Sequence, residues 1–239
     1  MATMDETAEL IRRNWMSVKT QVREAAESVG RNFDSVRVIG VSKYVDAATT
    51  QLLCDAGCTD LGESRPQVLW DKAEQIQSCG TSGVPPRWHM IGHVQTNKLR
   101  RMLRYDPLIH SVDSERLLRA IDDEGNRQSR VIDVLLEVNI SGDQSKTGMS
   151  RETLKQVLNI EGITGARIIG LMAMAGWGTE ASEAADQFQS VASLRDELAK
   201  SSGLPLKELS MGMSGDFREA IAAGATMVRI GSALFEGVV

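Results

Sequence analysis

The sequence predicts an α/β protein: a single (β/α)8 TIM-type barrel with an extra N-terminal helix. Short runs of β-branched and apolar residues alternate with helical stretches along the whole chain. Such alternation implies parallel strands joined by right-handed crossovers. The sequence holds eight strand-like runs within 239 residues, and eight strand–helix units in about 250 residues is the size of a closed barrel. An open, doubly wound sheet is the alternative.

The first 30 residues predict a helix that packs on the outside of the barrel. Its apolar residues recur every three or four positions, which places them on one face, and Gly30 follows as a C-terminal cap. No Pro/Ser-rich linker divides the chain, so residues 1–239 are expected to form one domain. The apolar face consists of Ile11, Trp15, Val18, Val22, Ala25 and Val29.

The remaining elements follow in strict alternation. Strands are expected at Val36–Val41, Thr59–Leu61, Arg87–Ile91, Leu108–Ser111, Val131–Val138, Gly165–Met172, Glu208–Leu209 and Thr226–Ile230. Helices are expected near Ala47–Ala56, Arg65–Ser78, Asn97–Tyr105, Ser114–Gly125, Arg151–Asn159, Ser182–Lys200 and Asp216–Ala223.

Charge and composition narrow the possible partners and the location. The net charge of −5 argues against a nucleic-acid partner, which needs a clustered basic surface. A short basic run, Lys98 to Arg104, is interpreted as a solvated helix face. No apolar run approaches the roughly 18 residues of a membrane span, and the acidic N-terminus is no signal peptide, so the protein is expected in the cytoplasm. Three cysteines without CxxC spacing favour buried reduced thiols.

Lys43 is the first candidate functional residue. It follows the apolar strand that ends with Val41, and the C-terminal ends of barrel strands are where function collects. An amine in a partly dry mouth is favoured in its neutral form, which attacks carbonyl groups to form Schiff bases. The alternative is a lysine that merely extends into solvent at a strand end.

The last two loops predict a phosphate cradle formed by Ser214, Gly215, Gly231 and Ser232. Small residues let backbone N–H groups approach an anion, and a helix N-terminus adds a favourable dipole. Phosphate sites of barrels commonly lie in these two loops. We also expect a capping box between Asp216 and Glu219 at the start of the helix.

Arg229 lies two residues before Gly231 on the last strand. Alternation along a strand places the two on one face, so Arg229 can point into the barrel mouth. A salt bridge on the outer face is the alternative.

The motifs, taken in order, resemble the pyridoxal phosphate homeostasis protein family, relatives of the barrel domain of alanine racemase. The resemblance covers about Val36 to Phe235. The matching motifs are Ile39–Lys43, Leu61–Glu63, Trp88–Gly92, Gln95–Lys98, His110–Asp113, Asn139–Ser141, Lys146–Gly148, Gly170–Met172, Leu209–Ser214 and Met227–Gly231.

This resemblance implies that the chain binds pyridoxal 5′-phosphate (PLP). The barrel would be that of the fold type III PLP proteins without their second β domain. Lys43 would form the internal aldimine, and Ser214, Gly231 and Ser232 would hold the phosphate. Arg229 would face the pyridine nitrogen, with Met90 and Ile91 near the ring. A cation beside that nitrogen disfavours its protonation, which weakens the ring as an electron sink, so a non-catalytic PLP carrier is expected.

Some positions depart from the family or stay open. Ser64 replaces the usual Asn, and His93 stands where Pro is common. For His93 a structural role is favoured over substrate contact, and His89 is expected in the core or at a cap. Met172 and Met174 are interpreted as barrel filling. Lys146 is open between surface charge and a second anion-contacting lysine. We expect no metal site, because the histidines form no HExxH motif.

Two other functions remain as alternatives. A PLP-dependent amino-acid racemase needs a second base, and only Tyr44 is near Lys43. An aldolase-like lyase would carry its lysine on a later strand. The expected partners are PLP and apo-PLP enzymes as recipients, and the sequence favours a monomer.

Overall fold

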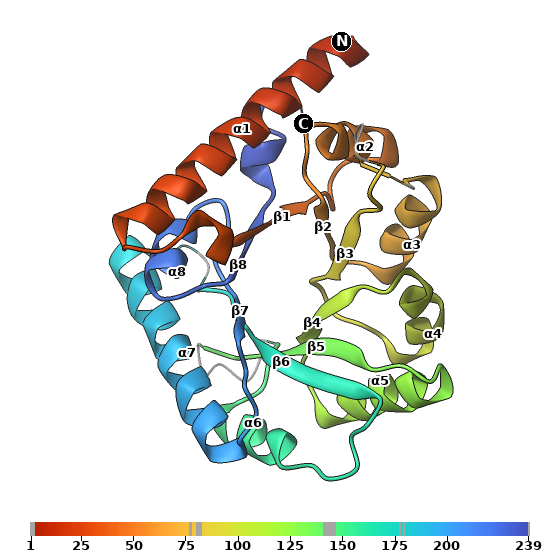
Figure 1. The fold of residues 1–239 in the computed structure, drawn as a ribbon, viewed down its shortest axis with the longest axis vertical. Helices are drawn as coiled ribbons and strands as arrows, with labels where there is room; N and C mark the ends of the chain where they lie inside the picture. The colour runs from red at the N-terminus through yellow and green to blue at the C-terminus, as the bar shows by residue number, and fades with distance from the viewer. Residues whose placement is uncertain are drawn as a thin grey trace.

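Eight parallel strands close into a barrel in the order β1 to β8, so the predicted fold is confirmed (Figure 1). The computed structural model describes residues 3–76, 78–79, 83–140, 147–176, 178 and 180–238. All eight predicted strands are present within one to two residues of the expected bounds. They are β1 (Arg37–Val41), β2 (Asp60–Glu63), β3 (Arg87–Met90), β4 (Leu108–Val112), β5 (Ile132–Glu137), β6 (Ala166–Met172), β7 (Glu208–Ser210) and β8 (Met227–Ile230).

The helices surround the barrel (Figure 1). They are α1 (Met4–Ser28), α2 (Ala47–Asp55), α3 (Pro66–Gln75), α4 (Leu99–Met102), α5 (Glu115–Arg127), α6 (Arg151–Leu158), α7 (Ala181–Ser202) and α8 (Phe217–Ala222). The helix expected at Asn97–Tyr105 is only one α-helical turn, α4, between two 3-10 turns, Thr96–Lys98 and Leu103–Tyr105.

The long helix α1 packs outside the barrel against α2 and α8, as the sequence predicts. Its predicted apolar face is buried except for Val29, which follows the last helical turn. Gly30 adopts a φ of +72° and donates its N–H to Glu27 O, so it ends the helix as expected. The amide of Asn14 donates to two carbonyl oxygens of the C-terminal turn, at Leu234 and Glu236. The first helix therefore fixes the end of the chain beside β1.

Pairing of β1 with β8 closes the barrel. The two strands run in register from Arg37 opposite Met227 to Gly40 opposite Ile230. Parallel strands place their C-terminal ends at one edge. Residues that follow Val41 and Ile230 therefore emerge side by side, although most of the chain lies between them in sequence.

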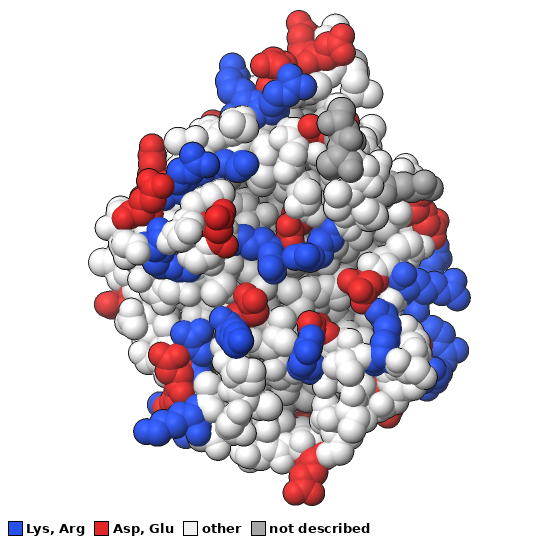
Figure 2. Space-filling model, viewed as in Figure 1, with Lys and Arg blue, Asp and Glu red and all other residues white. Residues whose placement is uncertain are grey.

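The surface carries both signs of charge. On the face that Figure 2 shows, basic and acidic side chains are interspersed. The basic run is a solvated surface: Arg100 pairs with Glu124, and Arg101 with Glu74. The three cysteines are buried and are not joined in disulfides, as predicted. Among the helices of the described residues, none combines the length and apolar character needed to cross a membrane.

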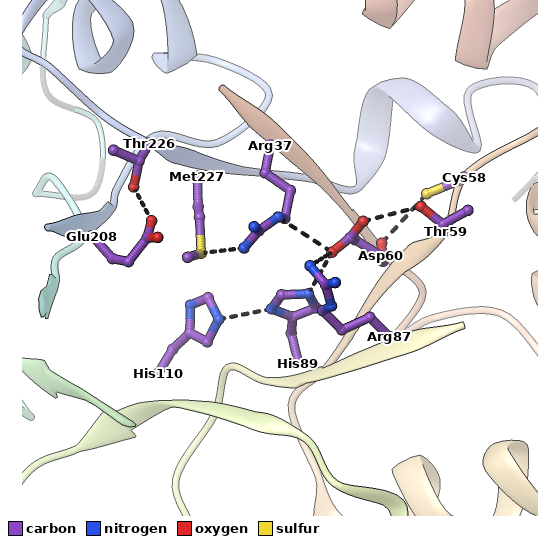
Figure 3. A network of polar contacts seen from close by, with 10 residues as sticks. All are labelled: Arg37, Cys58, Thr59, Asp60, Arg87, His89, His110, Glu208, Thr226 and Met227. Carbon is purple, nitrogen blue, oxygen red and sulfur yellow. Dashed lines mark hydrogen bonds and ion pairs between the residues drawn. The ribbon is translucent and has the colours of Figure 1, made fainter. Parts of the chain in front are cut away.

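The barrel interior is partly polar. His89 on β3 and His110 on β4 are completely buried and contact each other, and His89 also contacts Asp60 (Figure 3). Burial lowers the pKa of His89, and burial together with the neighbouring His89 lowers the pKa of His110 well below its usual value. Both imidazoles are therefore neutral in the folded protein near neutral pH.

These neutral histidines predict a loss of stability in mild acid. Below about pH 6.5 the same side chains take up protons in the unfolded chain but not in the folded one. The stability is fully present above that pH, and the free energy of unfolding should fall by up to about 1.4 kcal/mol per pH unit for each histidine. Urea unfolding between about pH 7.5 and 5 measures this slope, in a range that lies above most carboxylate titrations.

The variant His110→Gln serves as the comparison. It removes one of the two titrating groups, so its unfolding free energy should depend less steeply on pH than that of the wild type. Equal slopes in the two proteins would contradict the assignment of a neutral buried His110.

Candidate functional site

A cavity of about 350 Å³ opens at the C-terminal ends of the strands. All sequence-predicted site residues except Met90 line it, although they come from elements far apart in sequence. The residues around the cavity are Val41, Lys43, Tyr44, Ser64, Ile91, Met174, Met213, Ser214, Gly215, Arg229, Gly231 and Ser232.

Lys43 lies two residues beyond the end of β1. Val41 and Lys43 line the cavity, whereas Ser42 between them is buried against the neighbouring elements, as strand alternation requires. The Lys43 side chain is exposed, so the expectation of a partly dry mouth is wrong for the protein alone. Its Nζ atom lies 4.8 Å from the ring centroid of Tyr44, which is itself 82% exposed.

A buried ion pair supports the backbone at Lys43. Lys72 on α3 lies 2.6 Å from Glu63 Oε1 at the end of β2, and it also donates to the carbonyl of Ser42 at 2.8 Å. The Ser42 hydroxyl donates to the same Glu63 oxygen at 2.7 Å. The ammonium group thus joins the ends of two strands to a helix, which fixes the residue just before Lys43.

The loop after β7 supplies Ser214 and Gly215. Gly212 starts this loop with a φ of +92°, and a Cβ at this position would lie 2.5 Å from the Cβ of Ala220. A glycine is therefore required for the loop to fold back against α8. The predicted capping box is wrong, because the Asp216 carboxylate accepts the N–H of Met213 at 2.5 Å and makes no cap bond with the helix. Burial raises the pKa of Asp216.

Backbone N–H groups of the last loop converge on Ser214. The Ser214 hydroxyl oxygen accepts the N–H of Gly231 at 3.3 Å and that of Ala233 at 3.5 Å. A Cβ on Gly231 would lie 3.3 Å from the carbonyl oxygen of Val41, so the small residue permits a close approach of this loop to β1. The Ser214 hydroxyl of one loop and two N–H groups of the other therefore meet at one point, and backbone N–H groups of such loops are the kind of donor that an anion site uses.

Arg229 points into the barrel, and the alternative of an outer-face salt bridge is wrong. Its guanidinium donates to the carbonyl and the hydroxyl of Ser210 at 2.6 and 2.8 Å, and to the carbonyl of Ala173 at 2.8 Å. Only 4% of the residue is exposed. Burial lowers the pKa of Arg229 to about 10, so it stays a cation at neutral pH.

Met90 does not lie at the cavity, which corrects the placement expected beside Ile91. In the β2–β3 register Met90 is opposite Glu63, whose side chain faces helix α3. Met90 therefore faces the outer hydrophobic core, where it is fully buried. Ile91, one residue further, lines the cavity.

The sequence interpretation missed an apolar rim of two methionines. Met174 was expected to fill the barrel together with Met172, but it is 44% exposed and lines the cavity with Met213. Met174 lies two residues past the end of β6, which is the same position that Lys43 has relative to β1. This equivalent position after a strand could have predicted from the sequence that Met174 lies at the cavity. Ser64, the departure from the family pattern, also lines the cavity.

The other polar candidates lie elsewhere. His93 is exposed and bonds to Asp113 at 3.0 Å, outside the residues that line the cavity. His89 is in the core, as predicted. Lys146 lies outside the described residues.

The fold and the site define a class of protein: a (β/α)8 barrel with a lysine just after β1 and glycine- and serine-containing loops after β7 and β8 around one cavity. Comparisons with known proteins identify this class. The family model described as "Alanine racemase, N-terminal domain" matches residues 9–238. A solved structure of PipY from Synechococcus elongatus with PLP bound has a TM-score of 0.81 and 31% identity, covering 94% of this chain and 99% of that one.

Curated relatives agree with this class. Proteins named pyridoxal phosphate homeostasis protein from Pseudomonas aeruginosa and Deinococcus radiodurans are 35% and 37% identical, covering 94% and 92% of this chain and 94% and 98% of the relatives. Alanine racemase from Corynebacterium glutamicum shares the fold at 14% identity and a TM-score of 0.68, over 60% of that chain. The chain therefore belongs to the pyridoxal phosphate homeostasis protein family, within the alanine racemase N-terminal domain family.

The buried ion pair beneath Lys43 predicts a large effect of Lys72→Met on stability. The substitution leaves the Glu63 carboxylate buried without its cation, which should lower the free energy of unfolding by about 3–5 kcal/mol. Urea unfolding measures the loss. The double variant Glu63→Gln with Lys72→Met should recover part of it, because no buried charge is left.

Lys155→Met is the matched control. Lys155 forms an ion pair of 2.9 Å with Glu197 on the exposed surface, where such a pair contributes at most about 1 kcal/mol. A loss in Lys72→Met no greater than that in Lys155→Met would contradict the role given to the buried pair.

Proposed function

We propose that this protein binds PLP and takes part in its homeostasis, with Lys43 as the covalent attachment point and the last two loops as the phosphate site. One observation carries the proposal: Lys43, Ser214, Gly231 and Ser232 line the same cavity. The relatives named pyridoxal phosphate homeostasis protein and the PLP-bound structure of PipY support it.

The residues of the cavity fit PLP. The volume of about 350 Å³ lies within the range of about 300–1,000 Å³ typical of small-molecule sites. The Ser214 hydroxyl can donate to a phosphate, and the N–H groups of Gly231 and Ala233, which donate to Ser214 Oγ in this structure, would become available to a phosphate if that side chain turned away. Ile91 and the two rim methionines offer apolar surface to a ring, and Arg229 provides a cation for the ring nitrogen.

When bound, PLP supplies an aldehyde that bonds reversibly to an amine. Lys43 provides that amine: its nitrogen would bond to the aldehyde carbon and a water molecule would leave. Because Lys43 is exposed, water has access to reverse the bond and release the cargo. Reversible attachment at an open site suits a protein that stores PLP or passes it on.

Two features favour holding PLP over catalysing a reaction with it. Arg229 is a buried cation that would face the ring nitrogen, and a cation there disfavours protonation of that nitrogen. The ring would then stabilise carbanions poorly. Tyr44, the one tyrosine beside Lys43, lies against the lysine ammonium and is largely exposed, which is a poor arrangement for a second base across the cavity.

The partners follow from this role. We propose apo-PLP enzymes as recipients of the released cofactor. A monomeric state and a cytoplasmic location stay predictions from the sequence.

Lys43→Ala tests the attachment point. The wild type reconstituted with PLP should be yellow and should carry PLP on Lys43 after borohydride reduction and peptide mapping. The variant should lose the absorption band of the lysine adduct, because it lacks the reacting nitrogen. Lys200→Ala, an exposed lysine on α7, is the matched control and should keep the band.

A colourless wild type that cannot be reconstituted would refute the proposal, and label on another lysine would move the attachment point. The proposal that the protein holds PLP without catalysing a reaction is tested with the same samples. Substantial racemisation of alanine that disappears in Lys43→Ala would show that the protein is an enzyme.

Replacing Ser214 and Ser232 together by Ala should weaken PLP retention. Each hydroxyl would lose a hydrogen bond to a charged phosphate, worth about 1.5–3 kcal/mol, so the dissociation constant should rise at least about 100-fold for the pair. Equilibrium dialysis measures this constant. Ser193→Ala on the exposed face of α7 should bind like the wild type. Unchanged retention in the double variant would mean that the phosphate lies elsewhere.

A further inference from the structure

A chain of hydrogen bonds runs through the barrel interior to Arg229. It begins at Asp60 at the start of β2 and continues through His89 and His110. The Asp60–His89 contact is 3.0 Å and the His89–His110 contact is 2.9 Å (Figure 3). His110 Nδ1 then lies 2.8 Å from the Ser210 hydroxyl, which accepts from Arg229 at 2.8 Å.

Such a chain is unusual for this fold. The interior of a closed eight-stranded barrel is normally filled with layers of branched apolar side chains. Here both imidazoles, the serine and the arginine are almost completely buried. Burying so many polar groups is costly unless each finds a partner, and every link of this chain is of hydrogen-bonding length.

The two ends of the chain determine the direction of every hydrogen bond. At one end, Arg229 can only donate, so the Ser210 oxygen accepts from it. The hydrogen of the Ser210 hydroxyl is then free to be donated to His110 Nδ1. This assignment requires that His110 carries its proton on Nε2, next to His89 Nδ1.

The other end gives the same direction. Burial raises the pKa of Asp60, but the hydrogen bond from His89 and the charges of Arg37 and Arg87 outweigh this and lower it. Asp60 is therefore a carboxylate and accepts from His89 Nε2. His89 Nδ1 is left as an acceptor for the proton on His110 Nε2. Each imidazole is neutral, each tautomer is fixed, and all bonds point from the arginine to the aspartate.

The chain therefore connects a buried cation to a carboxylate at the opposite end of the barrel. The hydrogen bonds of the Arg229 guanidinium to described residues go to the carbonyl oxygens of Ala173 and Ser210 and to the Ser210 hydroxyl. Aligned hydrogen bonds polarise one another. The negative charge of Asp60 thus strengthens the Ser210 oxygen as an acceptor for Nη1.

We propose that Asp60, His89, His110 and Ser210 are positioning residues for the PLP site, which fix the orientation of Arg229 toward the ring nitrogen. This inference rests on the proposed function. The chain holds Nη1, the carbonyl of Ala173 holds Nη2, and Arg229 lines the cavity in this orientation. In this arrangement a residue at the far end of the barrel acts on bound PLP only through Arg229.

Ser210→Ala breaks the chain at its last link. In the complex with PLP labelled with ¹⁵N in the pyridine ring, the nitrogen resonance should shift relative to that of the wild type. The dissociation constant for PLP should rise about fivefold, as expected for one lost hydrogen bond of about 1 kcal/mol. Ser210→Thr keeps the hydroxyl and should restore both values toward those of the wild type.

Asp60→Asn tests the charge at the other end. Asparagine can still accept from His89, so the geometry is kept while the negative charge is removed. The ¹⁵N resonance should shift in the same direction as in Ser210→Ala but by less. Because this variant alters a partly exposed residue, it provides a folded sample even if Ser210→Ala unfolds.

Thr226→Ala is the matched control. Thr226 also bonds across the β7–β8 pair, to Glu208 at 2.6 Å and to the N–H of Leu209 at 2.9 Å, but it is outside the chain (Figure 3). It should lower stability without moving the ¹⁵N resonance. A resonance unchanged in Ser210→Ala and Asp60→Asn while the wild type binds PLP would overturn the positioning role alone. A wild type that does not bind PLP would overturn both this inference and the proposed function.

Discussion

Closure of the barrel between β1 and β8 is the constraint on which the site depends. These two strands hydrogen-bond along their length, and their registered pairs continue to Gly40 and Ile230. Lys43 lies two residues beyond the end of β1, and Gly231 and Ser232 directly follow β8. The proposed attachment point and the proposed phosphate site lie far apart in sequence, and they are neighbours because the first strand pairs with the last.

The Glu63–Lys72 pair and Arg229 are buried charged groups near the cavity, and the structure stabilises their charges in different ways. Glu63 and Lys72 form a direct ion pair between β2 and α3, where the cation also binds the backbone of Ser42. Arg229 instead is held by carbonyl and hydroxyl oxygens, and the chain through two neutral histidines leads to Asp60. A direct carboxylate partner would neutralise the guanidinium charge locally. Among the described residues, the hydrogen bonds of the Arg229 guanidinium go to neutral oxygens, and the residue lines the cavity.

The sequence predicted the architecture because strand–helix alternation is a local pattern that survives in the structure. The sequence also predicted that Arg229 points into the barrel, because residues two apart on a strand share a face and Gly231 lies two residues after Arg229. The same rule, applied to β3, separates Met90 from Ile91, but the expected site included both because they are adjacent in the family motif. The register of β2 and β3, which pairs Met90 with Glu63, shows that Met90 faces away from the cavity.

The features that were missed depend on contacts between distant strands. The Asp216 carboxylate bonds to Met213 in its own loop, so the capping pattern with Glu219 was satisfied in sequence but not in space. The histidine chain joins β2, β3, β4 and β7, and its links span up to 100 residues. Single-strand periodicity can show that His89 and His110 face inward, but it cannot show that their ring nitrogens meet, which requires the relative stagger of the strands.

The geometry of the cavity at the C-terminal ends of the strands also bears on why such a barrel would bind PLP without catalysing a reaction with it. An enzyme excludes water from the reacting atoms and completes its set of acids and bases around them. Here the amine and Tyr44 are open to solvent, while the most deeply buried polar group in contact with the cavity is a cation whose surroundings fix its charge and orientation. In the proposed function, this buried cation would restrain the reactivity of a bound ring. The exposed rim, in contrast, would leave the proposed bond at Lys43 accessible to water and to a competing amine, so attachment and release could both proceed at the same open face.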